Sequence, residues 1–382
     1  MAYCNALENT MEIKFFGNDR QYQNLKPEWN KAVEKVWASG QYFSDSHVLE
    51  LEKTLAQLCG RKYAVSLSSC TDALYFALNS SQAKKTLVSN FSFLASATGI
   101  LRNAGAPSFI DLKDGEYSPS AREYQKVLNQ DNKVDSLIHV SLFGECALNF
   151  EAENFAKKNS LFFIEDSAQS FGSYCENRPA GNFGQASCLS FDPTKIIAGT
   201  SGAGALLTDD EEIYHNTLRL RLHGRDSRNG EFQHLGYKSL LASSEAAILL
   251  LKLKYLESYI QRRREIAQEF NNAFSSNPFL ITPHKNQFLD EEFPQHVFHK
   301  YVLTVKNSSR ENLQKYLKGK GIETRIHYPK LISDEKLFGL ESQTPNAKAA
   351  CETVFSLPIY PELKDEEVSY IIKAVNSYFE TL

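Results

Sequence analysis

Seven short apolar runs between residues 63 and 209 constrain the fold of this chain more than any other feature of its sequence. Each run is near-continuously apolar rather than alternating, which is typical of strands in a sheet covered on both faces. Helix-length segments separate several runs, and repeated strand–helix–strand units predict a mostly parallel sheet in a three-layer α/β/α fold. The predicted strands are Tyr63–Leu67, Lys85–Ser89, Pro107–Leu112, Ser136–Leu142, Leu161–Asp166, Ala186–Phe191 and Ala203–Asp209, with helices at Asp72–Asn79, Leu94–Asn103 and Phe150–Lys158.

The pattern changes after Asp209. Apolar residues at helical spacing predict one long helix over Ser243–Phe274, and we expect its Arg262–Arg264 run to lie on a solvated face. We divide the chain into a large domain, residues 1–255, and a smaller C-terminal α+β domain, residues 256–382, which is a usual domain size. The later elements predicted are a strand at Phe298–Val305 and helices at Arg310–Lys318, Asn346–Val354 and Asp365–Phe379.

Composition excludes several classes of function. The net charge of −4 is small and no stretch gathers Lys and Arg, so nucleic acid is not an expected partner. The longest apolar stretches fall short of the roughly 20 residues of a membrane span, and the N-terminus lacks the pattern of a secretory signal, although Met11 offers a second start. The seven cysteines are scattered without a C-x-x-C pair, so we expect reduced thiols in a cytoplasmic protein and no metal site.

Polar residues follow three of the predicted strands, where ligands bind in an open α/β sheet. Ser68–Asp72 ends the first strand and begins a helix, so it offers a phosphate site, although Ser69 or Thr71 could instead only cap that helix. Asp166 ends a strongly apolar strand, and Ser190 and Lys195 lie just past another. A lysine and a buried carboxylate in one crevice suit a cofactor that needs a Schiff-base amine and a pyridinium partner, but they suit a structural ion pair equally well.

Eight segments in a fixed order resemble one family, the DegT/DnrJ/EryC1/StrS aminotransferases. These are pyridoxal-phosphate-dependent enzymes of fold type I, with the aspartate aminotransferase fold, that aminate nucleotide-linked keto sugars. The resemblance runs from about Phe15 to the C-terminus. Its segments are SGQYFSD (39–45), SSCTDAL (68–74), FSFLASA (91–97), EDSAQSFG (165–172), SFDPTK (190–195), LRLHGRD (220–226), LGYKS (235–239) and FSLPIYPEL (355–363).

The resemblance implies a role for each matching residue. Lys195 is expected to form the Schiff base with pyridoxal 5'-phosphate and to carry protons, while Asp166 is expected to keep the pyridine nitrogen protonated. The other cofactor contacts implied are Cys70, Thr71 and Ser190 at the phosphate, Gln169 near the ring hydroxyl, Phe93 stacked on the ring, and Lys238 reaching the partner subunit's cofactor in a homodimer. Tyr328 and His327 are expected to contact the substrate, a nucleotide-linked keto sugar, with L-glutamate as amino donor.

Three departures from the family pattern affect the subunit interface and the substrate side. Lys238 replaces the usual Asn, Leu240 the usual Arg, and Ser141 the common His before Leu142. Two alternatives stay open: a sugar dehydratase of the same family, which resembles the pattern with His in place of Lys195, and a non-enzymatic regulatory homologue. A lone His is more often structural, so His223 is a weaker candidate for a general base than the lysine.

Overall fold

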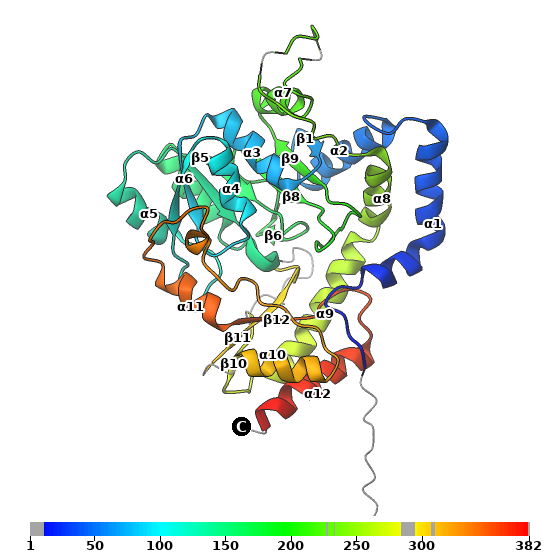
Figure 1. Cartoon of the computed structure of the whole chain (residues 1–382), viewed down its shortest axis with the longest axis vertical. Coiled ribbons are helices and arrows are strands. Elements are labelled where there is room, and N and C mark those ends of the chain that lie inside the picture. Colours follow the sequence, from blue (N-terminus) through cyan, green and yellow to red (C-terminus); the bar gives the residue numbers. More distant parts are fainter. Residues whose placement is uncertain (1–10, 227, 233, 284–294, 307–309, 381–382) are drawn as a thin grey trace, which may run out of the picture.

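A seven-stranded sheet forms the centre of the computed structural model, which describes residues 11–226, 228–232, 234–283, 295–306 and 310–380 (Figure 1). Strand β9 runs antiparallel to both of its neighbours, and the other neighbouring pairs are parallel. The predicted α/β fold with a mostly parallel sheet is confirmed. The strand order is β1 (Tyr63–Leu67), β9 (Gly204–Thr208), β8 (Ala186–Ser190), β5 (Phe162–Asp166), β4 (Ser136–Val140), β2 (Lys85–Ser89) and β3 (Ala106–Ile110).

Helices cover both faces of this sheet, because successive side chains of a strand point to opposite faces. Along β5, Ile164 packs in one cluster with α3 and α4, whereas Phe163 packs in another with α5 and α6. Helices α2 and α8 extend the second layer over β8 and β9. The helices of this unit are α1 (Asn18–Ser39), α2 (Ser46–Leu58), α3 (Cys70–Ser81), α4 (Ala95–Arg102), α5 (Ala121–Gln130), α6 (Asn149–Lys158), α7 (Glu211–Leu220) and α8 (Ser243–Leu253).

Short elements complete the larger unit at its loops. A two-stranded ribbon follows β5, and single 3-10 turns follow β4 and precede α11. These elements are β6 (Tyr174–Cys175), β7 (Arg178–Pro179), η1 (Leu142–Gly144) and η2 (Ile332–Asp334).

The smaller unit has an antiparallel sheet packed against helices (Figure 1). Its elements are α9 (Leu256–Phe274), β10 (Leu280–Ile281), β11 (Tyr301–Val305), α10 (Arg310–Gly319), β12 (Val354–Leu357) and α12 (Asp365–Glu380), and α11 (Pro345–Thr353) packs on the larger core. The N-terminal segment also reaches this unit, since Ile13 pairs with Ile322 and packs in the smaller core. The contiguous boundary between residues 255 and 256 stays a prediction.

Two expectations about the segment after residue 243 are wrong. The expected single helix is two helices, separated by Lys254 and Tyr255, because the chain leaves helical geometry at Tyr255, where φ is −108° and ψ is 5°. Neither residue is Gly or Pro, so the sequence carries no signal for this break. The arginine run is not solvated: Arg263 and Arg264 are each only 6% exposed, and Arg263 donates to the carbonyl oxygen of Ile359 at 2.6 Å. A buried guanidinium is tolerated there because it is hydrogen-bonded to a carbonyl.

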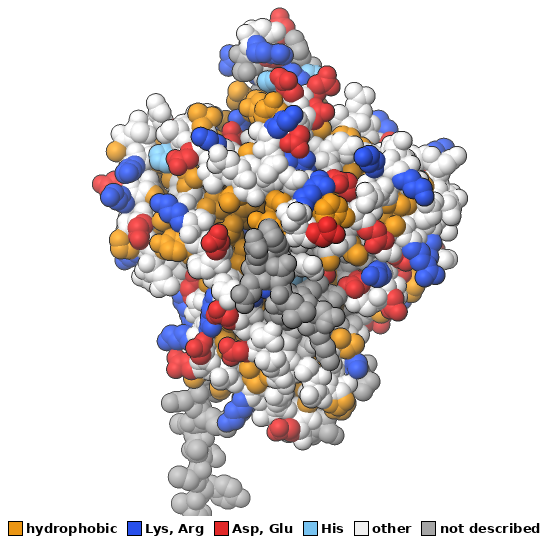
Figure 2. All heavy atoms as spheres, turned by 180° about the vertical axis from the view of Figure 1, so that it is seen from behind, with side chains coloured by type: hydrophobic (Ala, Val, Ile, Leu, Met, Phe, Trp, Pro, Cys, Tyr) orange, Lys and Arg blue, Asp and Glu red, His pale blue; other side chains and the backbone are white. Residues whose placement is uncertain are grey.

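The surface carries charges of both signs. Figure 2 shows Lys and Arg side chains interspersed with Asp and Glu side chains over the face that it presents. Within the described part of the chain, no helix combines the length and the hydropathy that a membrane span requires.

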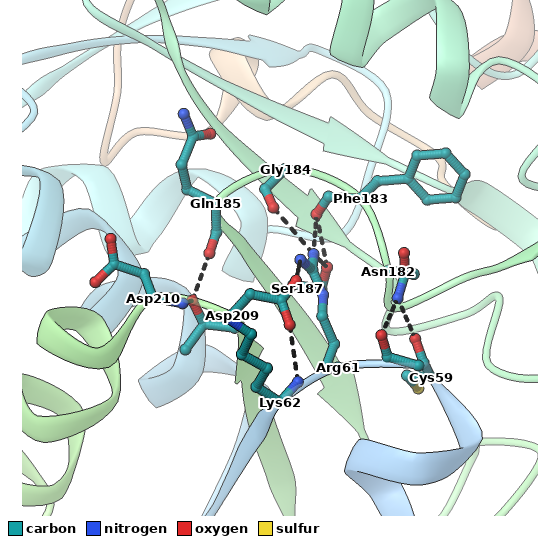
Figure 3. A network of polar contacts seen from close by, with 12 residues as sticks. Cys59, Arg61, Lys62, Asn182, Phe183, Gly184, Gln185, Ser187, Asp209 and Asp210 are labelled. Atoms are coloured by element: carbon teal, nitrogen blue, oxygen red, sulfur yellow. Dashed lines mark hydrogen bonds and ion pairs between the residues drawn. The ribbon is translucent and has the colours of Figure 1, made fainter.

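Arg61 fixes the loop that joins β5 to β8 (Figure 3). Its guanidinium donates to the carbonyl oxygens of Gly181, Phe183 and Gly184 at 3.0, 2.6 and 3.0 Å, and it also binds Ser187 and Asp209. The side chain is only 4% exposed, so water cannot replace these bonds. The chain after β5 is therefore held against β1 and β9.

We predict that Arg61→Ala lowers the free energy of unfolding by about 3 kcal/mol or more, because buried carbonyl oxygens lose their donors. Thermal and urea denaturation measure this loss. Lys62→Ala is the matched control: the side chain is exposed, and the expected change is within about 0.5 kcal/mol. Equal stability of the two variants would contradict the assigned role of Arg61.

Candidate active site

A cavity of about 400 Å³ lies at the carboxyl ends of β1, β2, β4, β5 and β8. These strands point in one direction, so the loops that follow them meet at one edge of the sheet. Nine of the ten predicted site residues line the cavity: Cys70, Thr71, Phe93, Asp166, Gln169, Ser190, Lys195, His327 and Tyr328. The tenth, Lys238, does not.

Asp166 and Lys195 face this cavity without pairing with each other. The carboxylate of Asp166 accepts hydrogen bonds from the hydroxyl of Ser96 at 2.7 Å and the backbone N–H of Ala168 at 3.1 Å. Both residues are described, and no ion pair within 4.0 Å joins them. Burial raises the pKa of Asp166 and lowers the pKa of Lys195, in each case favouring the neutral form. Asp166 and Lys195 therefore do not form the structural ion pair that was the alternative to a cofactor site.

Adjacent carboxylates at the end of β5 point to opposite sides. Glu165 is fully buried and accepts hydrogen bonds from the backbone N–H groups of Gly181 and Phe183 and from the side chains of Asn149 and Ser187. Asp166, the next residue, is therefore turned toward the cavity by the alternation of the strand. Glu165 holds the loop and leaves Asp166 available to a ligand.

The N-terminus of α3 forms one wall. Ser69 caps the helix, since its hydroxyl accepts from the N–H of Asp72 at 3.1 Å, and Cys70 and Thr71 begin the first turn. A β-carbon at Gly204 would lie 2.3 Å from the nitrogen of Cys70, so only glycine lets β9 approach this turn. Unpaired N–H groups and the helix dipole make such a wall suited to a phosphate. Ser69 thus caps α3, which was the alternative to a phosphate site, and it also lines the cavity.

Gln169 links the two units across the cavity. Its side-chain oxygen accepts from the N–H of Phe143 at 3.1 Å, and its nitrogen donates to the hydroxyl of Tyr328 at 3.0 Å. His299 lies beside it, with Nδ1 at 3.2 Å from the same oxygen of Gln169. The side chains of the smaller unit are thus positioned by residues that follow β4 and β5.

Phe93 and His327 differ in their exposure to water. Phe93 is 58% exposed, and its ring centre lies 6.3 Å from that of Tyr328. An exposed ring at a cavity is available for stacking on a flat ligand. His327 lies within 2.9 Å of the hydroxyl of Ser356, and burial, followed by the positive charges of Lys300, Lys195 and Arg325, lowers its pKa to about 3. His327 is therefore a neutral polar contact at neutral pH.

Lys238 and His223 lie outside the cavity lining. Lys238 is exposed, and its ammonium lies 4.5 Å from the centre of the Phe43 ring. His223 is also exposed and takes a positive φ of 58°.

The hydrogen bonds of Ser141 explain why serine is accommodated where the family commonly has His. The Ser141 hydroxyl donates to Asn149, which in turn donates to Glu165.

Several cavity residues were missed at the level of sequence. Ser96 lies in the quoted segment FSFLASA, and a hydroxyl in the first turn of the helix that follows a strand is a usable signal for a bond to a nearby carboxylate. Phe16, His299 and Lys300 come from segments distant in sequence from the sheet, and only the folded chain brings them to the cavity.

This fold, with a lysine, an unpaired carboxylate and a helix N-terminus around one cavity, defines a pyridoxal-phosphate-dependent transferase. The chain belongs to the DegT/DnrJ/EryC1/StrS aminotransferase family, whose sequence model matches residues 23–376. It is 31% identical over 359 residues to dTDP-3-amino-3,6-dideoxy-alpha-D-galactopyranose transaminase of Aneurinibacillus thermoaerophilus, covering 92% of this chain and 95% of that one. It is 28% identical over 379 residues to a pleiotropic regulatory protein of Geobacillus stearothermophilus, covering 97% of this chain and 99% of that one.

A solved structure shares the fold over nearly its whole length. DesV of S. venezuelae, solved in complex with a ketimine intermediate, superposes with a TM-score of 0.91 at 25% identity, covering 98% of this chain and 100% of DesV.

The residues of the cavity fit pyridoxal 5'-phosphate. Asp166 is buried with hydrogen-bond donors, and among the described residues no cation lies within 4.0 Å of its carboxylate; a protonated ring nitrogen would supply that charge. The first turn of α3 and the hydroxyl of Ser190 suit a phosphate, and Lys195 supplies an amine.

We predict that Ser96→Ala weakens the binding of pyridoxal phosphate to the apoenzyme roughly tenfold near neutral pH. Without the Ser96 hydroxyl the carboxylate of Asp166 loses a donor, so its pKa rises further and it becomes protonated at a higher pH as the pH falls. Absorbance titrations at several pH values should therefore show the acid limb of binding at higher pH than in the wild type.

Ser92→Ala is the control for this prediction. Ser92 contacts Ser96 at 3.0 Å but makes no hydrogen bond to Asp166. An acid limb that moves to lower pH in Ser96→Ala, or that moves equally in both variants, would contradict the role assigned to Ser96.

Proposed function

We propose that this chain transfers an amino group from L-glutamate to a keto group of a nucleotide-diphosphate-linked deoxysugar, with pyridoxal phosphate as cofactor. The observation that carries the proposal is the presence of Lys195 and Asp166 in one cavity without a bond between them. A relative named as a transaminase of a dTDP-linked amino sugar supports the class of substrate. The enzyme acts in the cytoplasm, and its product is a deoxyaminosugar used in the biosynthesis of glycans.

Several cavity residues would hold the cofactor. Lys195 would hold it covalently through Nζ, and the carboxylate of Asp166 would keep its ring nitrogen protonated. The contacts proposed at its periphery are Cys70, Thr71 and Ser190 with the phosphate, Gln169 with the ring hydroxyl, and Phe93 with the ring face. Tyr328 and His327 face the sugar from the smaller unit.

Proton transfer falls to Lys195. When bound, pyridoxal phosphate would supply an electron sink for the reacting carbon. Lys195 Nζ would take the proton from the donor carbon and give a proton to the acceptor carbon. Burial lowers the pKa of this amine, so a larger share of it is neutral and able to act as a base near neutral pH.

A homodimer completes the site in this proposal. Lys238 is exposed and outside the cavity of its own chain, as a residue lent to the partner subunit would be. Its ammonium binds the partner's cofactor phosphate as a point charge, in place of the amide that is usual in the family.

Specific residues bear on two alternative functions, a dehydratase and a non-enzymatic regulatory protein. A dehydratase of this family resembles the pattern with His at the Schiff-base position, and this chain has Lys195. A non-enzymatic role is kept open by the relative named as a regulatory protein and by the departures at Lys238, Leu240 and Ser141.

The first test uses Lys195→Ala and visible absorbance. The wild type with pyridoxal phosphate should absorb in the visible range and lose that band on addition of L-glutamate, whereas Lys195→Ala should lack the band and all transaminase turnover. Turnover in the variant would sink the proposal. A wild-type band that L-glutamate leaves unchanged would favour the regulatory function.

The second test mixes two inactive variants. If each site needs Lys195 of one chain and Lys238 of its partner, Lys195→Ala and Lys238→Ala should each have little activity alone. After subunit exchange half of the dimers are mixed, and each mixed dimer has one intact site, so about a quarter of wild-type activity should return. Unimpaired Lys238→Ala, or no recovery on mixing, would refute the shared site.

A further inference from the structure

Lys300 is a buried lysine at the cavity that forms no ion pair with any of the described residues. Lys300 directly precedes β11, is only 5% exposed and lines the cavity. The ammonium lies 4.4 Å from the ring centre of Phe16 and 5.3 Å from that of Phe15. Among the hydrogen bonds and ion pairs of the described residues, none involves Lys300 Nζ; its backbone N–H alone donates, to Phe143. Ring faces attract a cation only weakly, so this charge lacks the partner that burial normally requires.

The charges around Lys300 are mostly positive. Burial first, and then Lys195, Arg263 and Arg325, lower its pKa well below the ordinary value, and Asp192 opposes them. A region of this sign attracts an anion, and an anion at Lys300 would restore the ammonium form. No carboxylate of the described residues lies within 4.0 Å of the ammonium, so an anion in contact with it has to come with a ligand.

The position of Lys300 separates this anion from the cofactor phosphate. The phosphate wall consists of the first turn of α3 and Ser190, which belong to the larger unit. Lys300 lies directly before β11 of the smaller unit and reaches the same cavity from there, with Phe16 of the N-terminal segment against its ammonium. Lys195 lies in the chain between β8 and β9 and lines the same cavity as Lys300. A substrate that presents its reacting carbon to Lys195 can therefore present a second group to Lys300.

We propose that Lys300 is a specificity-determining residue that binds a carboxylate of the substrate. This inference rests on the proposed function, because it assigns the ligand of the same cavity. The carboxylate belongs either to the amino donor, a dicarboxylic amino acid, or to an acceptor sugar that carries an acid group. An ammonium makes a strong charge-assisted hydrogen bond to a carboxylate, and the low dielectric of a buried site increases its strength.

Lys300→Met is the variant that tests this, because methionine keeps apolar contact with Phe15 and Phe16 while removing the charge. The probe is glutarate, a dicarboxylate without an amino group, whose binding to the pyridoxal-phosphate-loaded enzyme is measured by calorimetry. We expect its Kd to rise roughly 10- to 100-fold in Lys300→Met and to recover in part in Lys300→Arg. Lys330→Met is the matched control, since Lys330 is exposed, lies outside the cavity lining and carries the same charge.

Kinetics of the two half-reactions identify the source of the carboxylate. A raised KM for L-glutamate with little change in kcat supports a donor carboxylate, and a raised KM only for keto sugars that bear an acid group supports an acceptor carboxylate. The visible absorbance of the bound cofactor should be unchanged. Unchanged glutarate affinity together with unchanged KM values in Lys300→Met overturns the inference, even if the melting temperature falls.

Failure of the proposed function would look different. A wild-type protein that binds glutarate through Lys300 but does not transaminate would refute the aminotransferase proposal and leave the carboxylate site standing.

Discussion

The rest of the site depends on the different roles of two adjacent carboxylates: Glu165 anchors a loop, and Asp166 faces the cavity. Two carboxylates end one buried strand, and strand geometry sends them to opposite sides. Glu165 is saturated by backbone and side-chain donors of the loop that follows. Asp166 has hydrogen-bond donors but no ion-pair partner in the part of the chain that the structure describes. The same strand end therefore provides both the anchor of the loop and the acidic group of the cavity. The loop in turn is held from outside by Arg61 (Figure 3).

The smaller unit contributes a basic group, Lys300, to the same cavity. Lys300 faces the cavity from the smaller unit, and burial lowers the pKa of both Lys300 and Lys195. One cavity thus contains an acid, Asp166, and two amines, Lys195 and Lys300. Bound anions would favour the charged form of each amine, so the cavity suits a cofactor with a phosphate and an anionic substrate.

Much of the large unit could be predicted from sequence, because parallel strands buried on both faces are apolar throughout. All seven strands lie within two residues of their predicted ends. Helices α1 and α2 were not predicted. In α1 few side chains are buried, so its apolar periodicity is weak, whereas α2 has Val48, Leu51 and Leu55 at helical spacing and an Asp45 cap that could have been recognised. Arg263 was misjudged because its carbonyl partner at Ile359 is distant in sequence. Lys300 was missed for the same reason: its burial depends on the aromatic rings of an N-terminal segment.

The chain passes between the two units in more than one place. It does so between α8 and α9, and again where the segment around Ile13 leaves the smaller core and α1 packs on α8 (Figure 1). The segment between β11 and β12 makes a further connection, because Leu331, Ile332 and Ala347 pack in the core of the larger unit and Asn90 donates a hydrogen bond to Thr344. Connections at several separate points oppose both rotation and separation of the two units. The spacing between the groups that each unit contributes to the cavity is therefore fixed by the covalent path of the chain as well as by packing.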